Sequence, residues 1–152
     1  EKIYQAFYDD FSSLKMFLHS HSYSANPLAC ACANETFSML NENNFLPNLQ
    51  PKIKFMQEYG EKLRDLAWCG EFRQTGMTAR VELVQDKKTK EPFPFEKRLG
   101  YHIYLEALKR GALLRPLGNV IYFIPPLIIN PDEISAMIDT AYDSIQEVLG
   151  FT

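Results

Sequence analysis

One arginine in the last third of the chain stands between two short apolar segments. Arg115 follows residues 111–114, G-A-L-L, and the apolar residues 120–124 come after a short break. A guanidinium among apolar residues is costly unless an anion meets it, and its planar fork suits a carboxylate held through two hydrogen bonds. The pattern alone leaves two roles open. Arg115 binds the carboxylate of a substrate, or it forms a structural ion pair with an acid of the chain, such as Glu82.

A second place for chemistry is residues 19–24, with the sequence H-S-H-S-Y-S. These residues lie just before a predicted helix, whose first N–H groups are free to bind a phosphate, and Ser22 would add a hydroxyl donor. The competing interpretation is a loop in which the serines bond to their own backbone. A histidine–serine nucleophile pair has little support, because the chain has no G-x-S-x-G motif and no acid placed to orient the histidine.

Tyr122 is the third candidate, in the apolar segment that follows Arg115. If the two segments form an antiparallel hairpin, Arg115 and Tyr122 lie on neighbouring strands and could face one site. The alternative is a core tyrosine whose hydroxyl reaches the edge of the core.

Helices are expected where apolar residues recur at helical spacing. Asn26 followed by Pro27 is a strong helix start, because Asn caps free N–H groups and Pro suits the first helical position. Asn130 and Pro131 repeat this signal, with Glu133 placed for a capping box. The predicted helices cover residues 2–11, 27–40, 47–66, 96–110 and 131–150.

Strands are expected where apolar and polar residues alternate, as they do over residues 71–85 with a break at Gly76. Gly118 and Asn119 can supply the positive φ values of a tight hairpin turn between two further strands. The predicted strands lie within residues 71–85, 112–115 and 120–124, and a charged loop is expected over residues 86–95.

This order of elements predicts an α/β or α+β layer, a small sheet covered on one face by helices. Residues 1–25 do not fit the layer, and we expect them to be the end of another domain. Residues 26–152 would form a small C-terminal domain. Because the chain starts with Glu1 rather than Met, we expect a processed chain or a part of a longer protein.

The composition excludes several classes of function. The net charge is −3, and the three lysines within residues 87–90, K-K-T-K, stand between Asp86 and Glu91. The sequence therefore shows no basic surface of the kind that nucleic-acid-binding proteins have. No apolar run is long enough to cross a membrane. Cys30, Cys32 and Cys69 lack the spacing of a metal site, and we expect buried thiols in a reducing cytoplasm.

Three segments together resemble the class III aminotransferases. Residues 19–31, H-S-H-S-Y-S-A-N-P-L-A-C-A, resemble the family's H-[TS]-[FY]-x-G-N-P-x-A-C-A segment. Residues 72–83, F-R-Q-T-G-M-T-A-R-V-E-L, are similar to its strand pair V-R-x-x-G-x-x-x-x-V-E-L. Residues 114–126, which begin L-R-P-L-G-N-V-I-Y, match its late R-P-x-G segment and the strand after it. The segments come in the family's order, so the likeness covers essentially the whole chain.

The resemblance implies the C-terminal part of a fold-type I transferase whose cofactor is pyridoxal 5′-phosphate, with residues 1–25 ending the large cofactor-binding domain. It implies that Ser22 holds the cofactor phosphate in an active site shared between the two subunits of a homodimer. Arg115 would bind the substrate carboxylate, Tyr122 would line the same pocket, and Ser20 and His21 would lie beside the substrate. The expected partners are small-molecule substrates, with no nucleic acid and no membrane, in the cytoplasm.

Within the family, a tyrosine after Val-Ile, here Tyr122, resembles the members that act in biotin biosynthesis. Those enzymes transfer an amino group from S-adenosylmethionine to 8-amino-7-oxononanoate and give 7,8-diaminononanoate. Two alternatives remain. One is another class III ω-aminotransferase, acting on an ω-amino acid or a diamine, and the other is a freestanding binding domain without catalysis.

Two positions depart from the family pattern. Ala25 replaces the usual Gly, so the loop backbone must avoid a conformation that only glycine adopts readily. Ser22 stands where Thr is commoner, which keeps the hydroxyl. The family's Schiff-base lysine, and the aspartate that pairs with the pyridine nitrogen, are expected upstream of residue 1. No lysine here lies in the family's lysine motif, so we expect no catalytic residue in this chain and no activity from it alone.

Overall fold

The structure is a computed structural model, and it describes residues 1–10, 13, 15, 26–42 and 44–150. The chain divides into two compact units, Glu1–Asn43 and Asn44–Thr152. Each unit is described by itself. The sequence-based domain boundary after residue 25 stays a prediction.

The first unit holds the helices α1 (Lys2–Phe7) and α2 (Pro27–Asn41). The Asn26 side chain accepts hydrogen bonds from the backbone N–H groups of Leu28 and Ala29, at 3.0 and 3.2 Å, which confirms the predicted helix start. The helix predicted over residues 2–11 ends early. The Asp9 carboxylate accepts a hydrogen bond from the N–H of Asp10, and such local bonds compete with helix formation.

Helix α2 has no buried residue, and this corrects the expectation for two cysteines. Cys30 and Cys32 are exposed, whereas Cys69 in the second unit is buried as expected. None of the described residues of the first unit covers the faces of α2 that carry these thiols. Burial raises the pKa of the Cys69 thiol, which keeps it in the protonated form at neutral pH.

One long helix was expected over residues 47–66, and the structure has three shorter pieces in that region. They are α3 (Phe45–Asn48), α4 (Gln50–Gly60) and the 3-10 helix η2 (Glu61–Asp65). Pro51 stands in the first turn of α4, where its missing N–H is tolerated. Gly60 ends α4 directly over the Phe72 ring, so close that a side chain at this position would overlap it.

The second unit contains an antiparallel sheet with the strand order β1-β2-β5-β4, and a short β3 pairs with β2. The strands are β1 (Cys69–Thr75), β2 (Thr78–Asp86), β3 (Glu91–Pro92), β4 (Arg115–Leu117) and β5 (Val120–Phe123). The two strands predicted within residues 71–85 are confirmed. The loop predicted over residues 86–95 is wrong in part, because it contains β3.

The hairpin of β4 and β5 lies further along the chain than expected. Its first strand was predicted over residues 112–115 but begins at Arg115, and its turn consists of Gly118 and Asn119. The pairing of Leu117 with Val120 leaves only these two residues for the turn, and Gly118 has the positive φ of 58° that such a turn requires.

Two further helices belong to this unit: α5 (Leu99–Lys109) lies between β3 and β4 in the sequence, and α6 (Pro131–Gly150) follows β5. A 3-10 turn, η3 (Phe95–Lys97), precedes α5, because Arg98 adopts a left-handed conformation that separates the two. Gly111 after α5 has a φ of 87°, as expected for its C-terminal cap. The predicted capping box of α6 is confirmed: the side chains of Asn130 and Glu133 each accept a hydrogen bond from the other's N–H at 2.9 Å.

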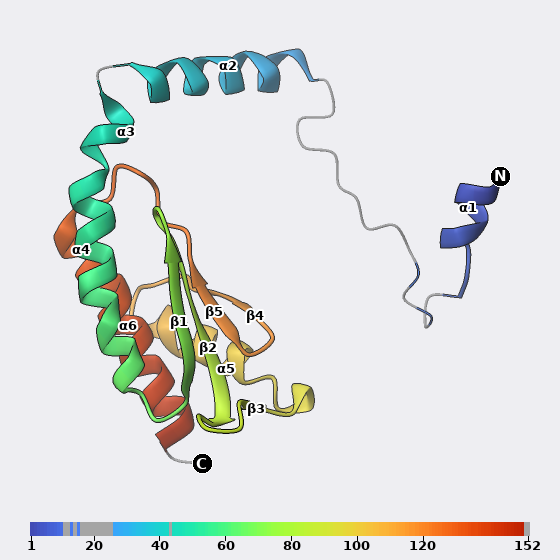
Figure 1. Ribbon diagram of the computed structural model, residues 1–152, viewed down its shortest axis with the longest axis vertical. Coiled ribbons are helices and arrows are strands. Elements are labelled where there is room, and N and C mark those ends of the chain that lie inside the picture. The colour runs from blue at the N-terminus through green and yellow to red at the C-terminus, as the bar shows by residue number, and fades with distance from the viewer. Residues whose placement is uncertain (11–12, 14, 16–25, 43, 151–152) are drawn as a thin grey trace. The chain divides into compact units, whose positions relative to one another are not determined.

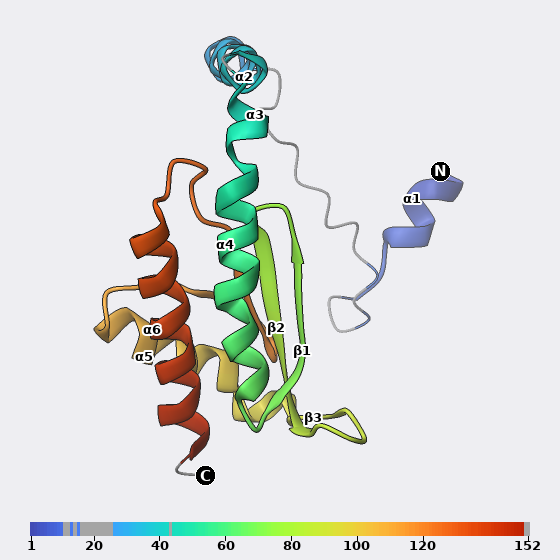
Figure 2. The same ribbon diagram turned by 60° about the vertical axis from the view of Figure 1, so that its left-hand side comes forward.

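Helices α4, α5 and α6 cover one face of the sheet, as Figures 1 and 2 show. The core lies between these helices and the sheet, and each fully buried aliphatic side chain contributes about 1.5–3 kcal/mol. Its fully buried members include Met56, Leu63, Val81, Leu83, Ile103, Ile121, Ile134, Ile138 and Ile145. The predicted fold class, a small sheet covered on one face by helices, is confirmed.

The other face of the sheet carries half-buried and exposed side chains, which include those of Arg80, Tyr122 and Arg115. None of the helices that the structure describes has both the length and the apolar character of a membrane span.

Candidate functional site

The hairpin of β4 and β5 brings together two of the residues singled out from the sequence. Arg115 and Tyr122 are direct partners in the antiparallel register. Ile121 and Phe123 point into the core, at 0% and 2% exposure, so Tyr122 between them points to the open face of the sheet. The guanidinium carbon of Arg115 lies 6.0 Å from the centre of the Tyr122 ring, at the outer limit of a cation–π contact.

Arg115 and Tyr122 line the same pocket, which has a volume of about 610 Å³. Its walls are residues 111–115 and 122–126, together with Ile129 and Met137. Arg115 is the only charged residue among them, and the others are mostly aliphatic or proline. Such a pocket fits an organic molecule with an apolar body and one anionic group.

Arg115 has no acidic partner within the part of the chain that the structure describes. The alternative drawn from the sequence, an ion pair with Glu82, does not form. Glu82 instead lies 3.9 Å from the guanidinium of Arg80. Arg115 is exposed on the open face rather than enclosed by apolar strands, so its fork of N–H donors is available to an anion.

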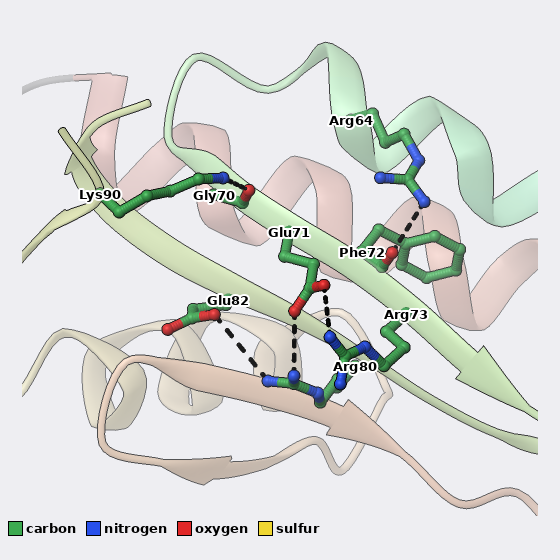
Figure 3. A network of polar contacts seen from close by, with 8 residues as sticks. All are labelled: Arg64, Gly70, Glu71, Phe72, Arg73, Arg80, Glu82 and Lys90. Atoms are coloured by element: carbon green, nitrogen blue, oxygen red, sulfur yellow. Dashed lines mark hydrogen bonds and ion pairs between the residues drawn. The ribbon is translucent and has the colours of Figure 1, made fainter. Parts of the chain in front are cut away.

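A second group of charges lies on the same face, over β1 and β2 (Figure 3). Arg73 donates a hydrogen bond to Glu71 at 2.7 Å, and Arg80 donates one to the other carboxylate oxygen at 3.0 Å. The hydrogen bond from Arg73 and the charges of Arg73 and Arg80 lower the pKa of Glu71, so this carboxylate is ionised at neutral pH.

These three residues were not among the candidates drawn from the sequence. Their signal is the period-two spacing of Glu71 with Arg73 and of Arg80 with Glu82, which places each pair on one face of its strand. The pairing of the two strands, which the spacing alone does not specify, then brings both pairs together.

Ser20, His21 and Ser22 lie outside the described residues, and their roles stay predictions from the resemblance. Next to them along the chain, the structure describes only the capped start of α2 at Asn26 and Pro27.

The described residues do not by themselves provide a site for pyridoxal phosphate. No lysine lines the pocket of Arg115 and Tyr122, so no amine in it can form a Schiff base. Lys62 is bound to Asp139 and Lys52 to the carbonyl oxygen of Leu127. Within the described part of the chain there is also no group of three side chains that could hold a metal ion. The pocket can hold and orient a carboxylate, which is a binding role.

Comparison with known proteins identifies the family. The model of the family described as Aminotransferase class-III matches residues 1–148. The adenosylmethionine-8-amino-7-oxononanoate aminotransferase of Geobacter sulfurreducens is 43% identical over 99% of this chain and 33% of its own length.

Solved structures show the same likeness. The crystal structure of the adenosylmethionine-8-amino-7-oxononanoate aminotransferase from Methanocaldococcus jannaschii superimposes with a TM-score of 0.76 at 38% identity, over 96% of this chain and 33% of that one. An (S)-enantioselective ω-transaminase from Thermomicrobium roseum gives a TM-score of 0.75 at 30% identity, over 88% and 30% of the two chains. The chain thus spans about a third of the length of the relatives it matches.

Proposed function

Since the chain belongs to the class III aminotransferases, we propose that it is the C-terminal portion of a pyridoxal-phosphate-dependent transaminase that transfers an amino group from S-adenosylmethionine to 8-amino-7-oxononanoate. The product would be 7,8-diaminononanoate, in biotin biosynthesis. One observation supports this proposal above the others: Arg115, without an acidic partner among the described residues, faces Tyr122 at the edge of an apolar pocket.

The pocket suits the proposed substrate chemically. The oxononanoate has a carboxylate at one end of an aliphatic chain, and the guanidinium of Arg115 would bind that carboxylate through two parallel hydrogen bonds. The apolar walls, which include Leu114 and Met137, would hold the chain and exclude water from it. Tyr122, on the strand next to Arg115, would restrict the position of the substrate carboxylate.

The cofactor would supply the electron sink for amino-group transfer, and the residues of this chain would position the substrate for it. Ser22 would donate a hydrogen bond to the cofactor phosphate, and Ser20 and His21 would lie beside the substrate. The Schiff-base lysine would come from the remaining part of the protein.

Names of relatives support the choice of substrate. The Geobacter sulfurreducens and Methanocaldococcus jannaschii proteins are named for adenosylmethionine and 8-amino-7-oxononanoate. The ω-transaminase likeness supports a second candidate, a class III enzyme for ω-amino acids or amines. Profiling a panel of amino acceptors with the full-length protein separates the two. A freestanding domain without catalysis has less support, because the family matched over residues 1–148 is a family of enzymes.

We further propose a homodimer with a shared active site, in the cytoplasm. Leu28, Phe37 and Met39 of α2 are 79%, 71% and 61% exposed, and a second copy is the partner proposed to cover them. Sedimentation of the full-length protein tests this proposal, and a monomer at micromolar concentration would contradict it.

The substrate assignment is tested by Arg115→Ala in the full-length protein. Loss of two charge-assisted hydrogen bonds should raise the KM for 8-amino-7-oxononanoate about a hundredfold or more, with the KM for the amino donor nearly unchanged. Arg98→Ala, which removes an exposed arginine stacked on Tyr101, is the control and should change neither constant. An unchanged KM for the oxononanoate in Arg115→Ala would show that the assigned role is wrong.

A further inference from the structure

One row of directly paired residues crosses the open face of the sheet. Arg73 of β1 is the direct partner of Arg80 in β2. Tyr122 of β5 lies next in the row, as the direct partner of both Arg80 and Arg115. Neighbouring strands are about 4.8 Å apart, so the backbone positions of Arg80 and Arg115 are about 10 Å apart with Tyr122 between them.

The acids on this face are distributed unevenly along the row. Glu71 accepts hydrogen bonds from Arg73 at 2.7 Å and from Arg80 at 3.0 Å, as Figure 3 shows. Glu82 adds a second acid 3.9 Å from Arg80. Arg115 has no acid beside it among the described residues. Two of the three guanidinium groups are therefore neutralised by the protein, and one is left for a ligand.

The neutralised pair borders the substrate pocket. Tyr122 lines the pocket of Arg115 and also a hollow of about 180 Å³ that Arg73 and Arg80 line on its other side. A ligand that binds Arg115 through one carboxylate and carries a second one about 10 Å away, two strand spacings, would bring that second group to Arg80. There it would meet the negative charge of Glu71 and a guanidinium that is already occupied.

We propose that Glu71 makes the site selective for substrates with a single carboxylate, because it keeps Arg73 and Arg80 paired and unavailable to a second one. The inference rests on the proposed function, which assigns the substrate carboxylate to Arg115. The favoured class is long-chain amino or oxo monocarboxylic acids, and the disfavoured class is dicarboxylic acids of similar length.

The test uses the full-length protein with its cofactor and two inhibitors of equal chain length, nonanoate and nonanedioate. Glu71→Gln removes the carboxylate that is hydrogen-bonded to Arg80. It should tighten the binding of nonanedioate about tenfold, as one new charge-assisted contact implies, and change the binding of nonanoate less than about threefold. The double variant Glu71→Gln/Arg80→Gln should lose this gain. Glu61→Gln, which removes the acid paired with Arg64, is the control and should leave both inhibitors unchanged.

An unchanged ratio of the two inhibition constants in Glu71→Gln, or a gain that survives in the double variant, would overturn the proposal. If the repulsion between Arg73 and Arg80 prevents Glu71→Gln from folding, the single variant Arg80→Gln provides the test, with the same two inhibitors. Arg80→Gln should leave the ratio of the two inhibition constants unchanged. Weaker binding of nonanedioate to this variant would overturn the proposal, because it would mean that Arg80 already binds the second carboxylate in the wild type. Failure of the proposed function looks different: Arg115→Ala would then leave nonanoate binding unaffected.

Discussion

Arg115 and Tyr122 face each other across β4 and β5 as direct register partners, with the guanidinium carbon 6.0 Å from the centre of the tyrosine ring. The pair lies on the open face of the sheet because the residues that flank Tyr122, Ile121 and Phe123, are buried against the helices. A cation and an aromatic ring on one side of an apolar pocket can hold a carboxylate at a defined position and orientation.

Replacing Arg115 by lysine tests whether the planar fork of the guanidinium matters. Lysine keeps the charge but cannot donate two parallel hydrogen bonds to one carboxylate. We expect a loss of about 1.5–3 kcal/mol in binding, or about ten- to a hundredfold in the KM for the oxononanoate. Steady-state kinetics of the full-length protein measure this. A lysine variant as good as the wild type would show that charge alone suffices.

Tyr122→Phe removes a hydroxyl and keeps the ring beside Arg115. If the hydroxyl contacts the substrate, the KM for the oxononanoate should rise about three- to tenfold, the effect of one neutral hydrogen bond, while thermal stability stays the same. Tyr101→Phe on α5 is the matched control and should change neither quantity. If the enzyme is instead an ω-transaminase for other amines, Tyr122→Phe should leave the acceptor KM unchanged.

Gly100→Ala tests the packing of α5 under the hairpin. A Cβ atom at this position would overlap the carbonyl oxygen of Gly118 and lie 2.7 Å from the Cβ of Pro116. We expect this overlap to lower the free energy of unfolding by about 1–3 kcal/mol, although alanine is the better helix former. Gly150→Ala, where the nearest atom is the Trp68 ring at 3.9 Å, is the control and should be neutral or stabilising in urea titrations. A stabilising Gly100→Ala would refute the close approach.

Lys62 and Asp139 should make the stability of the second unit depend on pH. The hydrogen bond that Lys62 donates to the Asp139 carboxylate raises the pKa of Lys62. Burial acts to raise the pKa of Asp139, but hydrogen bonds from Lys62 and Tyr59 outweigh it and lower that pKa. The stability from Asp139 is therefore complete above its ordinary pKa of 3.8 and is lost as pH falls through the lowered value. The stability from Lys62 is complete below 10.5 and is lost as pH rises through the raised value.

Asp139→Asn measures this contribution. The variant should be less stable than the wild type at neutral pH, by about 1 kcal/mol or less because both side chains are partly exposed. The difference should shrink below pH 3.8 and above pH 10.5. Glu58→Gln, which removes a largely exposed pair with Lys54, is the control. A difference that does not shrink below pH 3.8 and above pH 10.5 would mean that the pair contributes no electrostatic stability.

Local signals in the sequence predicted much of the fold. Asn26 and Asn130 mark helix starts by the bonds that their own side chains make, and Gly118 marks the hairpin turn through its positive φ. These features depend on a few neighbouring residues, and the structure confirms them. The antiparallel hairpin also brought Arg115 and Tyr122 together as expected.

Other features depend on contacts between distant segments, and the sequence pattern did not reveal them. Gly60, the last residue of α4, lies against the Phe72 ring, and the contact of these two residues is set by the fold. The pairing of Glu71 with Arg80 depends on the register of β1 against β2. The spacing of residues also could not show whether Arg115 pairs with Glu82. In the folded chain Arg80, and not Arg115, is the arginine beside that acid.

The length of the two-residue turn between β4 and β5 determines which side chains of the hairpin lie on the open face of the sheet. Side chains alternate between the two faces of a strand, so one residue inserted between Leu117 and Val120 would turn Arg115 toward the helices and away from Tyr122. We therefore expect exchanges of side chains in this segment to disturb the site less than a change of its length by one residue. Insertions and deletions are tolerated better at positions such as residues 87–90, where an exposed turn joins β2 to β3.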